Sequence, residues 1–122
     1  MGNRGNILVK HGESSYVHVY THFKGDRLPG VIRHVLSSDD MTIDVAYLTR
    51  LVVLAMGDDD DYSGVGISPR RQDNENDIFV IDPENREIQR WSAERYERWD
   101  EAPPIPGEKP LETWTFDAFK GG

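Results

Sequence analysis

Apolar and polar residues alternate between positions 16 and 23, which is the spacing of a β-strand with two unlike faces. One face carries Val17, Val19, Thr21 and Phe23 and is suited to a protein core. The other face carries two phenols and two imidazoles, in the order Tyr16, His18, Tyr20 and His22. Such groups stack on planar molecules and form hydrogen bonds. The pattern therefore predicts that this Tyr/His row is the functional surface of the chain.

Two simpler patterns flank the Tyr/His row. Residues 7–9 form an apolar run, and the turn at 11–13 joins this run to the row as a β-hairpin. Beyond the row, apolar residues between 28 and 36 recur three and four positions apart, with Pro29 in the first turn. This second pattern predicts a helix.

A further helix is predicted to begin at Asp40 or Asp44 and to end at Gly57. Residues 51–56 are apolar on every side of that helix. Because a helix without a polar side belongs in the interior, we expect it to be the most buried element of the fold.

The second half of the chain contains another hairpin. Residues 78–81 and 86–91 have strand character and flank a turn at 82–85. Pro83 suits the second position of this turn, and Asn85 is expected to take the left-handed conformation. Residues 65–67 and 112–116 each predict one more short strand.

Helices grouped between runs of strands are typical of the α+β class. We predict a mainly antiparallel sheet with two helices on one face, plus an extended C-terminal arm. Residues 1–100 are assigned to a single α+β domain, and residues 101–122 to a proline-containing linker and the arm. If the helices cover the apolar side of the first hairpin, the Tyr/His row is open, covered by the arm, or buried against a second subunit.

Composition and charge narrow the class of protein. The 122 residues include no cysteine, which excludes disulfides, thiolate metal sites and a cysteine nucleophile. The sequence predicts neither a membrane span nor a secretory signal, so we expect a cytoplasmic protein. With 22 acidic and 14 basic residues the formal charge is −8, which disfavours binding of long nucleic acid. A small phosphorylated ligand needs only one or two arginines and is compatible with this charge.

The first functional hypothesis is a non-catalytic binding protein. The Tyr/His row, with Arg70 or Arg71 nearby, would hold a planar anionic small molecule. Gly2 and Gly5 are typical of flexibility near a terminus, but Arg4 could reach an anion if the first strand is central in the sheet. We assign no cofactor and no metal ion to this site.

An acidic protein-binding inhibitor is the alternative hypothesis. Its acidic surface would occupy a basic, nucleic-acid-binding site on a partner protein, through Asp58, Asp59, Asp60 and Asp61. Trp114 and Phe116 lie beyond the linker and would add to a sheet edge or cover an apolar groove, on their own subunit or on a neighbour. A homo-oligomer is therefore expected.

A two-histidine phosphodiesterase or nuclease is the third hypothesis, for which His34 is available besides His18 and His22. No nucleophile motif accompanies them, so no residue is assigned a catalytic role. Four residues of strand place the Cα atoms of His18 and His22 about 13 Å apart, too far for one metal ion. A calcium-loop pattern that starts at Asp59 fails at Arg70, where the loop requires a glutamate.

Five short segments carry a resemblance to other proteins: Gly2–Ile7, Tyr20–His22, Leu28–Pro29, Tyr47–Arg50 and Gly64–Ser68. In these segments the chain resembles a group of small uncharacterised proteins of bacteria and their phages. The resemblance implies one compact cytoplasmic domain and supplies no activity. A phage origin would favour a counter-defence factor, which acts by occupying a host protein or by sequestering a signal molecule.

Overall fold

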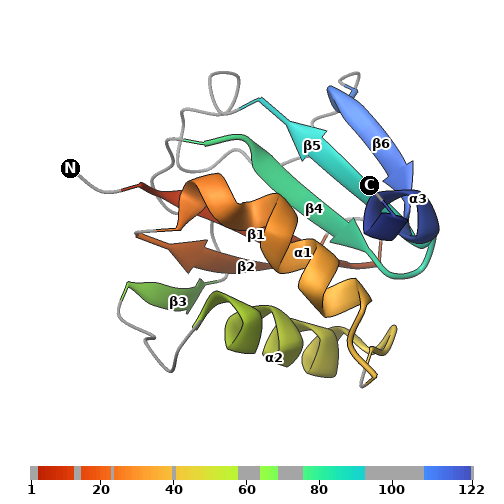
Figure 1. Ribbon diagram of the computed structural model, residues 1–122, viewed down its shortest axis with the longest axis horizontal. Helices are drawn as coiled ribbons and strands as arrows, with labels where there is room; N and C mark the ends of the chain where they lie inside the picture. The colour runs from red at the N-terminus through yellow and green to blue at the C-terminus, as the bar shows by residue number, and fades with distance from the viewer. Residues whose placement is uncertain are drawn as a thin grey trace.

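The computed structural model describes residues 3–12, 15–22, 24–39, 41–57, 64–68, 76–92 and 109–121. Within these ranges six strands form one sheet: β1 (Gly5–His11), β2 (Ser15–Thr21), β3 (Val65–Ser68), β4 (Ile78–Asp82), β5 (Glu87–Trp91) and β6 (Glu112–Thr115). The helices are η1 (Gly25–Arg27, a 3-10 turn), α1 (Leu28–Leu36), α2 (Val45–Met56) and α3 (Phe116–Gly121) (Figure 1).

The strand order in the sheet is β3-β2-β1-β4-β5-β6, so the first strand of the chain lies in the interior. Neighbouring strands are antiparallel except at the centre, where β1 and β4 are parallel and Ile7 lies opposite Phe79. The two predicted hairpins are confirmed as β1–β2 and β4–β5. The α+β class with a mainly antiparallel sheet is likewise confirmed.

Helices α1, α2 and α3 all lie on one face of the sheet, which we call the inner face (Figure 1). Helix α2 begins as predicted, because the Asp44 carboxylate accepts hydrogen bonds from the backbone N–H groups of Ala46 and Tyr47 at 3.0 and 3.3 Å. Gly57 ends it, and its N–H donates to the carbonyl of Val53. The capping residues Asp44 and Gly57 therefore set the two boundaries of α2.

Between the helices and the inner face lies the main hydrophobic core. Its strand residues are Ile7, Val9, Val19, Phe79, Ile81 and Ile88, and its helix residues include Leu28, Ile32, Leu48, Val52, Met56 and Phe119. These positions alternate along the strands and recur at helical spacing, as the sequence pattern requires.

The expectation that α2 is the most buried element is wrong. All five residues of β4 are buried, whereas Leu54 of α2 is exposed. A helix laid on one side of a sheet keeps an outward side, while a central strand is covered on both of its faces. Apolar composition alone did not distinguish the two cases.

The structure also does not show residues 112–121 as an extended arm. Strand β6 pairs antiparallel with β5, and α3 follows directly and buries Phe116 and Phe119 in the main core. The two phenylalanines lie three positions apart and therefore share one side of a helical turn. This short helix was missed because so few residues do not establish a helical period.

Candidate functional site

The face of the sheet turned away from the helices, here called the outer face, carries the Tyr/His row. Its middle is not open: Leu8, Ile78, Val80 and Trp91 are buried there as a second hydrophobic cluster, and Tyr16 packs against them. The register places His18 opposite Leu8, and only 4% of its surface is exposed. His18 therefore belongs to the protein interior, and Tyr16 is partly buried against the same cluster.

The second half of the row lies at the end of the sheet. Tyr20 and His22 are half-buried, and Tyr20 Oη shares a hydrogen bond of 3.0 Å with His22 Nδ1. Their ring centroids are 6.4 Å apart, and the ring planes are inclined by 58°. A bond at Nδ1 fixes the orientation of the imidazole, so that His22 Nε2 has a defined direction.

The backbone of His22 is fixed from both sides. Its N–H donates to the carbonyl of Gly64 at 2.9 Å, and its carbonyl accepts from the N–H of Asn3 at 2.7 Å. The Asn3 carbonyl in turn accepts from the N–H of Gly25 at 2.7 Å. The beginning of the described chain is thereby held between the residues that follow β2 and those that open η1.

Asn76 completes this clamp with its side-chain amide. Asn76 Nδ2 donates to Asn3 Oδ1 and to the Arg4 carbonyl, both at 2.7 Å, while Asn3 Nδ2 donates to Asp26. A Cβ atom on Gly25 would lie 2.5 Å from the Arg4 carbonyl oxygen and 2.3 Å from Asn76 Nδ2. Glycine is therefore required at position 25 for close approach of two backbones.

Gly5 has the same role, since a Cβ there would lie 2.8 Å from Gly25 Cα. The expectation that Gly5 provides flexibility is wrong, because it lets two backbone segments touch.

Arg4 was expected to reach an anion only if the first strand is central, and β1 is indeed central in the sheet. Arg4 directly precedes Gly5 and His22 directly follows Thr21, the last pair of the β1–β2 ladder, so both residues lie at this end of the sheet. We call Arg4, Tyr20 and His22 the Arg4–His22 site.

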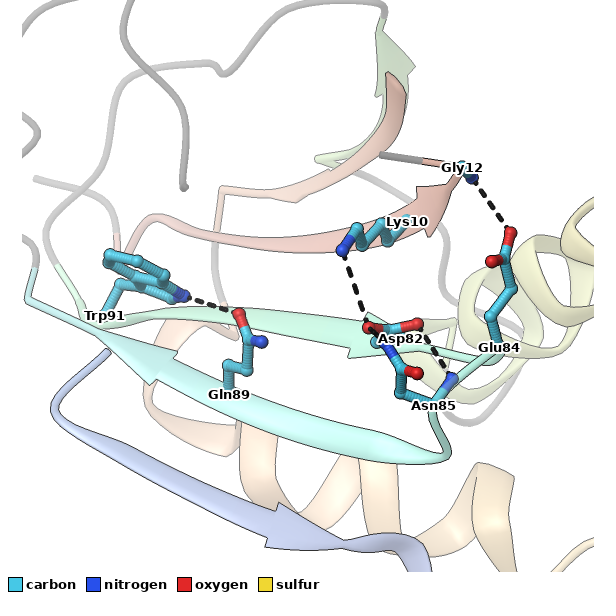
Figure 2. A network of polar contacts seen from close by, with 7 residues as sticks. All are labelled: Lys10, Gly12, Asp82, Glu84, Asn85, Gln89 and Trp91. Carbon is cyan, nitrogen blue, oxygen red and sulfur yellow. Dashed lines mark hydrogen bonds and ion pairs between the residues drawn. The ribbon is translucent and has the colours of Figure 1, made fainter. Parts of the chain in front are cut away.

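At the opposite end of the outer face lies a second polar group (Figure 2). The Asp82 carboxylate is 2% exposed, lies 3.6 Å from Lys10 Nζ, and accepts from the backbone N–H and side-chain amide of Asn85 at 3.2 and 2.9 Å. Glu84 accepts from the N–H of Gly12 at 3.2 Å, which ties the two hairpin turns together. These polar groups stabilise turns and carry no sign of a ligand site.

The β4–β5 turn differs from its prediction in one residue. Among the described residues other than glycine, Arg86 alone has a positive φ, of 53°, so the left-handed position is not Asn85. Asn85 is held by its two hydrogen bonds to Asp82, and the chain reverses one residue later. Two amide donors to one carboxylate outweigh the general tolerance of asparagine for this conformation.

The other predicted site residues are placed as follows. Arg70, Arg71 and the acidic run Asp58, Asp59, Asp60 and Asp61 lie outside the described residues. Phe116 is buried in the main core, and Trp114 packs against that core with its ring centroid 5.0 Å from that of Phe119. Both aromatic residues therefore contact their own chain.

Two further findings concern metals and membranes. In the described ranges, no group of three or more His, Cys, Asp or Glu side chains is arranged to hold a metal ion. None of the helices in those ranges has the length and apolar character that crossing a bilayer requires.

Sequence reasoning missed the clamp formed by Asn3, Gly25 and Asn76. Its signal in the sequence is weak, because glycine and asparagine are common in turns and these three lie far apart in the chain. Only the three-dimensional structure distinguishes a glycine that allows a turn from a glycine that allows two backbone segments to approach closely.

Comparison of the chain with protein-family models, with curated proteins and with solved structures finds no match. The function of the chain is therefore inferred from the geometry of the Arg4–His22 site.

Proposed function

We propose that this protein is a non-catalytic binding protein that holds a small planar anion at the Arg4–His22 site. The observation that carries the proposal is the clamp, which fixes the backbone of Arg4 and of His22 at one end of the outer face. A guanidinium, an imidazole and a phenol belong to residues at this end of the sheet, and the imidazole and the phenol are in contact. Sites that must orient a ligand are built on such fixed backbone.

The chemistry of the three side chains defines the ligand class. The guanidinium of Arg4 is suited to a carboxylate or phosphate, with which it can pair through two parallel N–H groups. The rings of Tyr20 and His22 supply aromatic surface on which a flat group can stack. The formal charge of −8 opposes a long polyanion, whereas one or two negative charges next to an arginine are accommodated.

Native mass spectrometry of the full chain purified from cells tests the proposal directly, because a carried ligand appears as added mass. Titrations with adenosine monophosphate and with inorganic phosphate then separate stacking from simple charge. We expect the nucleotide to bind more tightly, and Arg4→Gln or His22→Ala to weaken it by about 1–3 kcal/mol each. Equal affinity for both probes, or no binding by either, would contradict the proposal.

Matched controls come from the same chain. His11→Ala removes an exposed imidazole from the other end of β1, and Lys120→Gln removes an exposed positive charge from α3. Both variants should bind the nucleotide as the unmodified protein does. Loss of binding in these controls would indicate that the effect follows overall charge and not the Arg4–His22 site.

The other two hypotheses remain predictions. The acidic inhibitor depends on the run at 58–61, which lies outside the described residues. The two-histidine enzyme requires His18 and His22 to act together, whereas His18 packs near Tyr16 and His22 is bonded to Tyr20. The described contacts of His18 and His22 therefore do not favour the enzyme over ligand binding.

A further inference from the structure

Strand β3 forms one edge of the sheet (Figure 1). The N–H of His22 donates to the carbonyl of Gly64, which fixes the alternation of hydrogen bonds along the β2–β3 ladder. Every second residue from Gly64 bonds to β2, so the N–H and C=O groups of Val65 and Ile67 point away from the sheet. Within the described part of the chain, no main-chain group bonds to them on that side. These groups are a template for one more strand.

The opposite edge of the sheet, β6, is protected against such pairing. It contains Glu112, whose carboxylate is bonded to Arg90, and α3 follows β6 directly. β3 contains neither a charged residue nor a proline, and Ile67 is 62% exposed, the highest value among the large apolar residues described. Charges and prolines are the usual means by which edge strands avoid other chains. β3 is therefore the edge that is open to another strand.

The sequence of β3 is complementary to itself in the antiparallel direction. About a two-fold axis at Gly66, Val65 of each copy lies opposite Ile67 of the other, and these two pairs exchange four hydrogen bonds. Both side chains point to the inner face, because Val65 and Ile67 lie opposite Thr21 and Val19. The exposed Ile67 is thereby covered by a valine that packs against the core of the second copy. Gly66 meets Gly66 at the axis, where the two backbones approach most closely.

The charges around β3 favour this antiparallel arrangement over a parallel one. Each copy carries a formal charge of −8, so a contact between copies must keep acidic segments apart. Residues 58–63, before β3, include four aspartates, whereas residues 69–75, after it, include two arginines and two acidic residues and are neutral overall. Antiparallel strands set the acidic sequence of one copy against the neutral sequence of the other, whereas parallel strands would set two acidic sequences against each other. Asp39, Asp40 and Asp44 precede α2, and the start of that helix lies at its end away from β3 (Figure 1).

We propose that two copies of this chain form a symmetric dimer by antiparallel pairing of their β3 strands, which joins the two sheets into one. The pairing uses main-chain groups of β3. It is independent of ligand binding at the Arg4–His22 site, whose three side chains take no part in it.

Light scattering of the full chain tests the proposal. We expect a mass of twice 13.9 kDa that falls to that of one chain on dilution, because the shared edge is only four residues long. Ile67→Pro removes an N–H group that points away from β2, so we expect a folded monomer, whereas Ile67→Val keeps that group and should keep the dimer. Leu54→Glu changes an exposed residue of α2 and should also keep the dimer. A monomeric unmodified protein, a dimer that survives Ile67→Pro, or a dimer lost in Leu54→Glu would overturn the proposal.

Cysteine cross-linking tests the register without a proline, since the chain has no cysteine of its own. At the two-fold axis, two Gly66→Cys residues are directly opposite, at the Cα separation of about 4.5 Å that a disulfide accepts. A Cβ atom at Gly66 has nothing within 4 Å, so the single chain accommodates this change. Two Ser68→Cys residues lie about 13 Å apart along the paired strands and serve as the control.

We expect the Gly66→Cys disulfide to form at least tenfold faster than the Ser68→Cys disulfide. Equal rates would indicate parallel strands, and a faster Ser68→Cys disulfide would indicate a different register. Either result would overturn the proposed alignment. Circular dichroism of each variant confirms that it is folded before it is scored.

Discussion

The two ends of the outer face use polar residues in different ways. At the end containing Asp82, the carboxylate itself carries the structural hydrogen bonds, by accepting from Asn85 and lying beside Lys10. At the other end, the backbone atoms of Arg4 and His22 are bonded to Asn76, Asn3 and Gly64, and the His22 imidazole is bonded to Tyr20. The Asp82 side chain is used to hold a turn, whereas the clamp holds the backbone of Arg4 and His22 and thereby sets where their side chains start.

This contrast predicts that substitutions at the two ends change different quantities, the free energy of unfolding at one end and the ligand affinity at the other. Substitutions at the Asp82 end should lower the free energy of unfolding, because the β4–β5 turn would lose its hydrogen bonds to the buried Asp82 carboxylate. Side-chain substitutions within the Arg4–His22 site should act mainly on ligand affinity. The four predictions below test this separation, from the largest expected effect to the smallest.

Gly25→Ala should be the most damaging change. The added Cβ would collide with the Arg4 carbonyl and with Asn76, and the backbone cannot give way without breaking the clamp. We expect a loss of about 3 kcal/mol in urea unfolding, together with loss of ligand binding. Gly30→Ala is the control, since a Cβ there has nothing within 4 Å and should stabilise α1 by about 0.5–1 kcal/mol. Similar effects of the two changes would show that the clamp is not tight.

Asp82→Ala should cost about 2 kcal/mol in the free energy of unfolding, because it leaves the Asn85 amides and Lys10 without their common acceptor. Ligand affinity of the folded fraction should not change. Urea titration and calorimetric titration of the same sample measure the two quantities. Reduced affinity with unchanged stability would reverse the roles assigned to the two ends.

Arg90→Gln extends the test to the C-terminal edge, where Arg90 of β5 is bonded to Glu112 of β6 at 2.6 Å and to Asp77. The hydrogen bond to Glu112, followed by that to Asp77, raises the pKa of Arg90. A raised pKa in the folded state gives stability that is complete below the ordinary pKa of a guanidinium and is lost only as the pH rises above that pKa.

We therefore expect the Arg90→Gln loss to be the same at neutral and at mildly alkaline pH. Its size should be about 1 kcal/mol, because Glu112 is half-exposed to solvent. Hydrogen exchange should accelerate in β6 and remain unchanged in β4. Uniform acceleration across the sheet would show that this ion pair supports the whole core and not one edge.

Tyr20→Phe should have the smallest effect on stability, about 0.5 kcal/mol, since it removes one hydrogen bond from a half-buried pair. Nucleotide affinity should fall by a larger factor, because His22 loses the partner that orients it. The ring of His22 should then show two orientations by NMR. An unchanged imidazole spectrum would mean that the phenol does not fix the ring.

The local parts of the fold could be predicted from the sequence. Asp44 and Gly57 mark the ends of α2, and Pro83 marks the β4–β5 turn, because capping and turn formation depend on neighbouring residues. The parallel pairing of β1 with β4 could not be predicted in the same way. It joins residues far apart in the chain, and no short pattern records it.

The candidate site was predicted in part, for the same reason. Alternation identified the Tyr/His row, including Tyr20 and His22, but it could not show that His18 is buried while His22 lies at the sheet end. Alternation assigns a residue to a face, whereas depth on that face depends on which strands flank it. Arg4 could be assigned to the Arg4–His22 site only after the structure showed that β1 is central in the sheet.

The central parallel pair of β1 and β4 also sets the order in which the strands of the sheet can pair during synthesis. During synthesis β1 and β2 leave the ribosome early and can close their hairpin, but the second side of β1 stays without a partner until β4 has been made. The apolar segment around Leu8 therefore stays exposed on that side until β4 has been made. Nascent chains that stall before Ile78 should bind chaperones, and completion of β4 should release them.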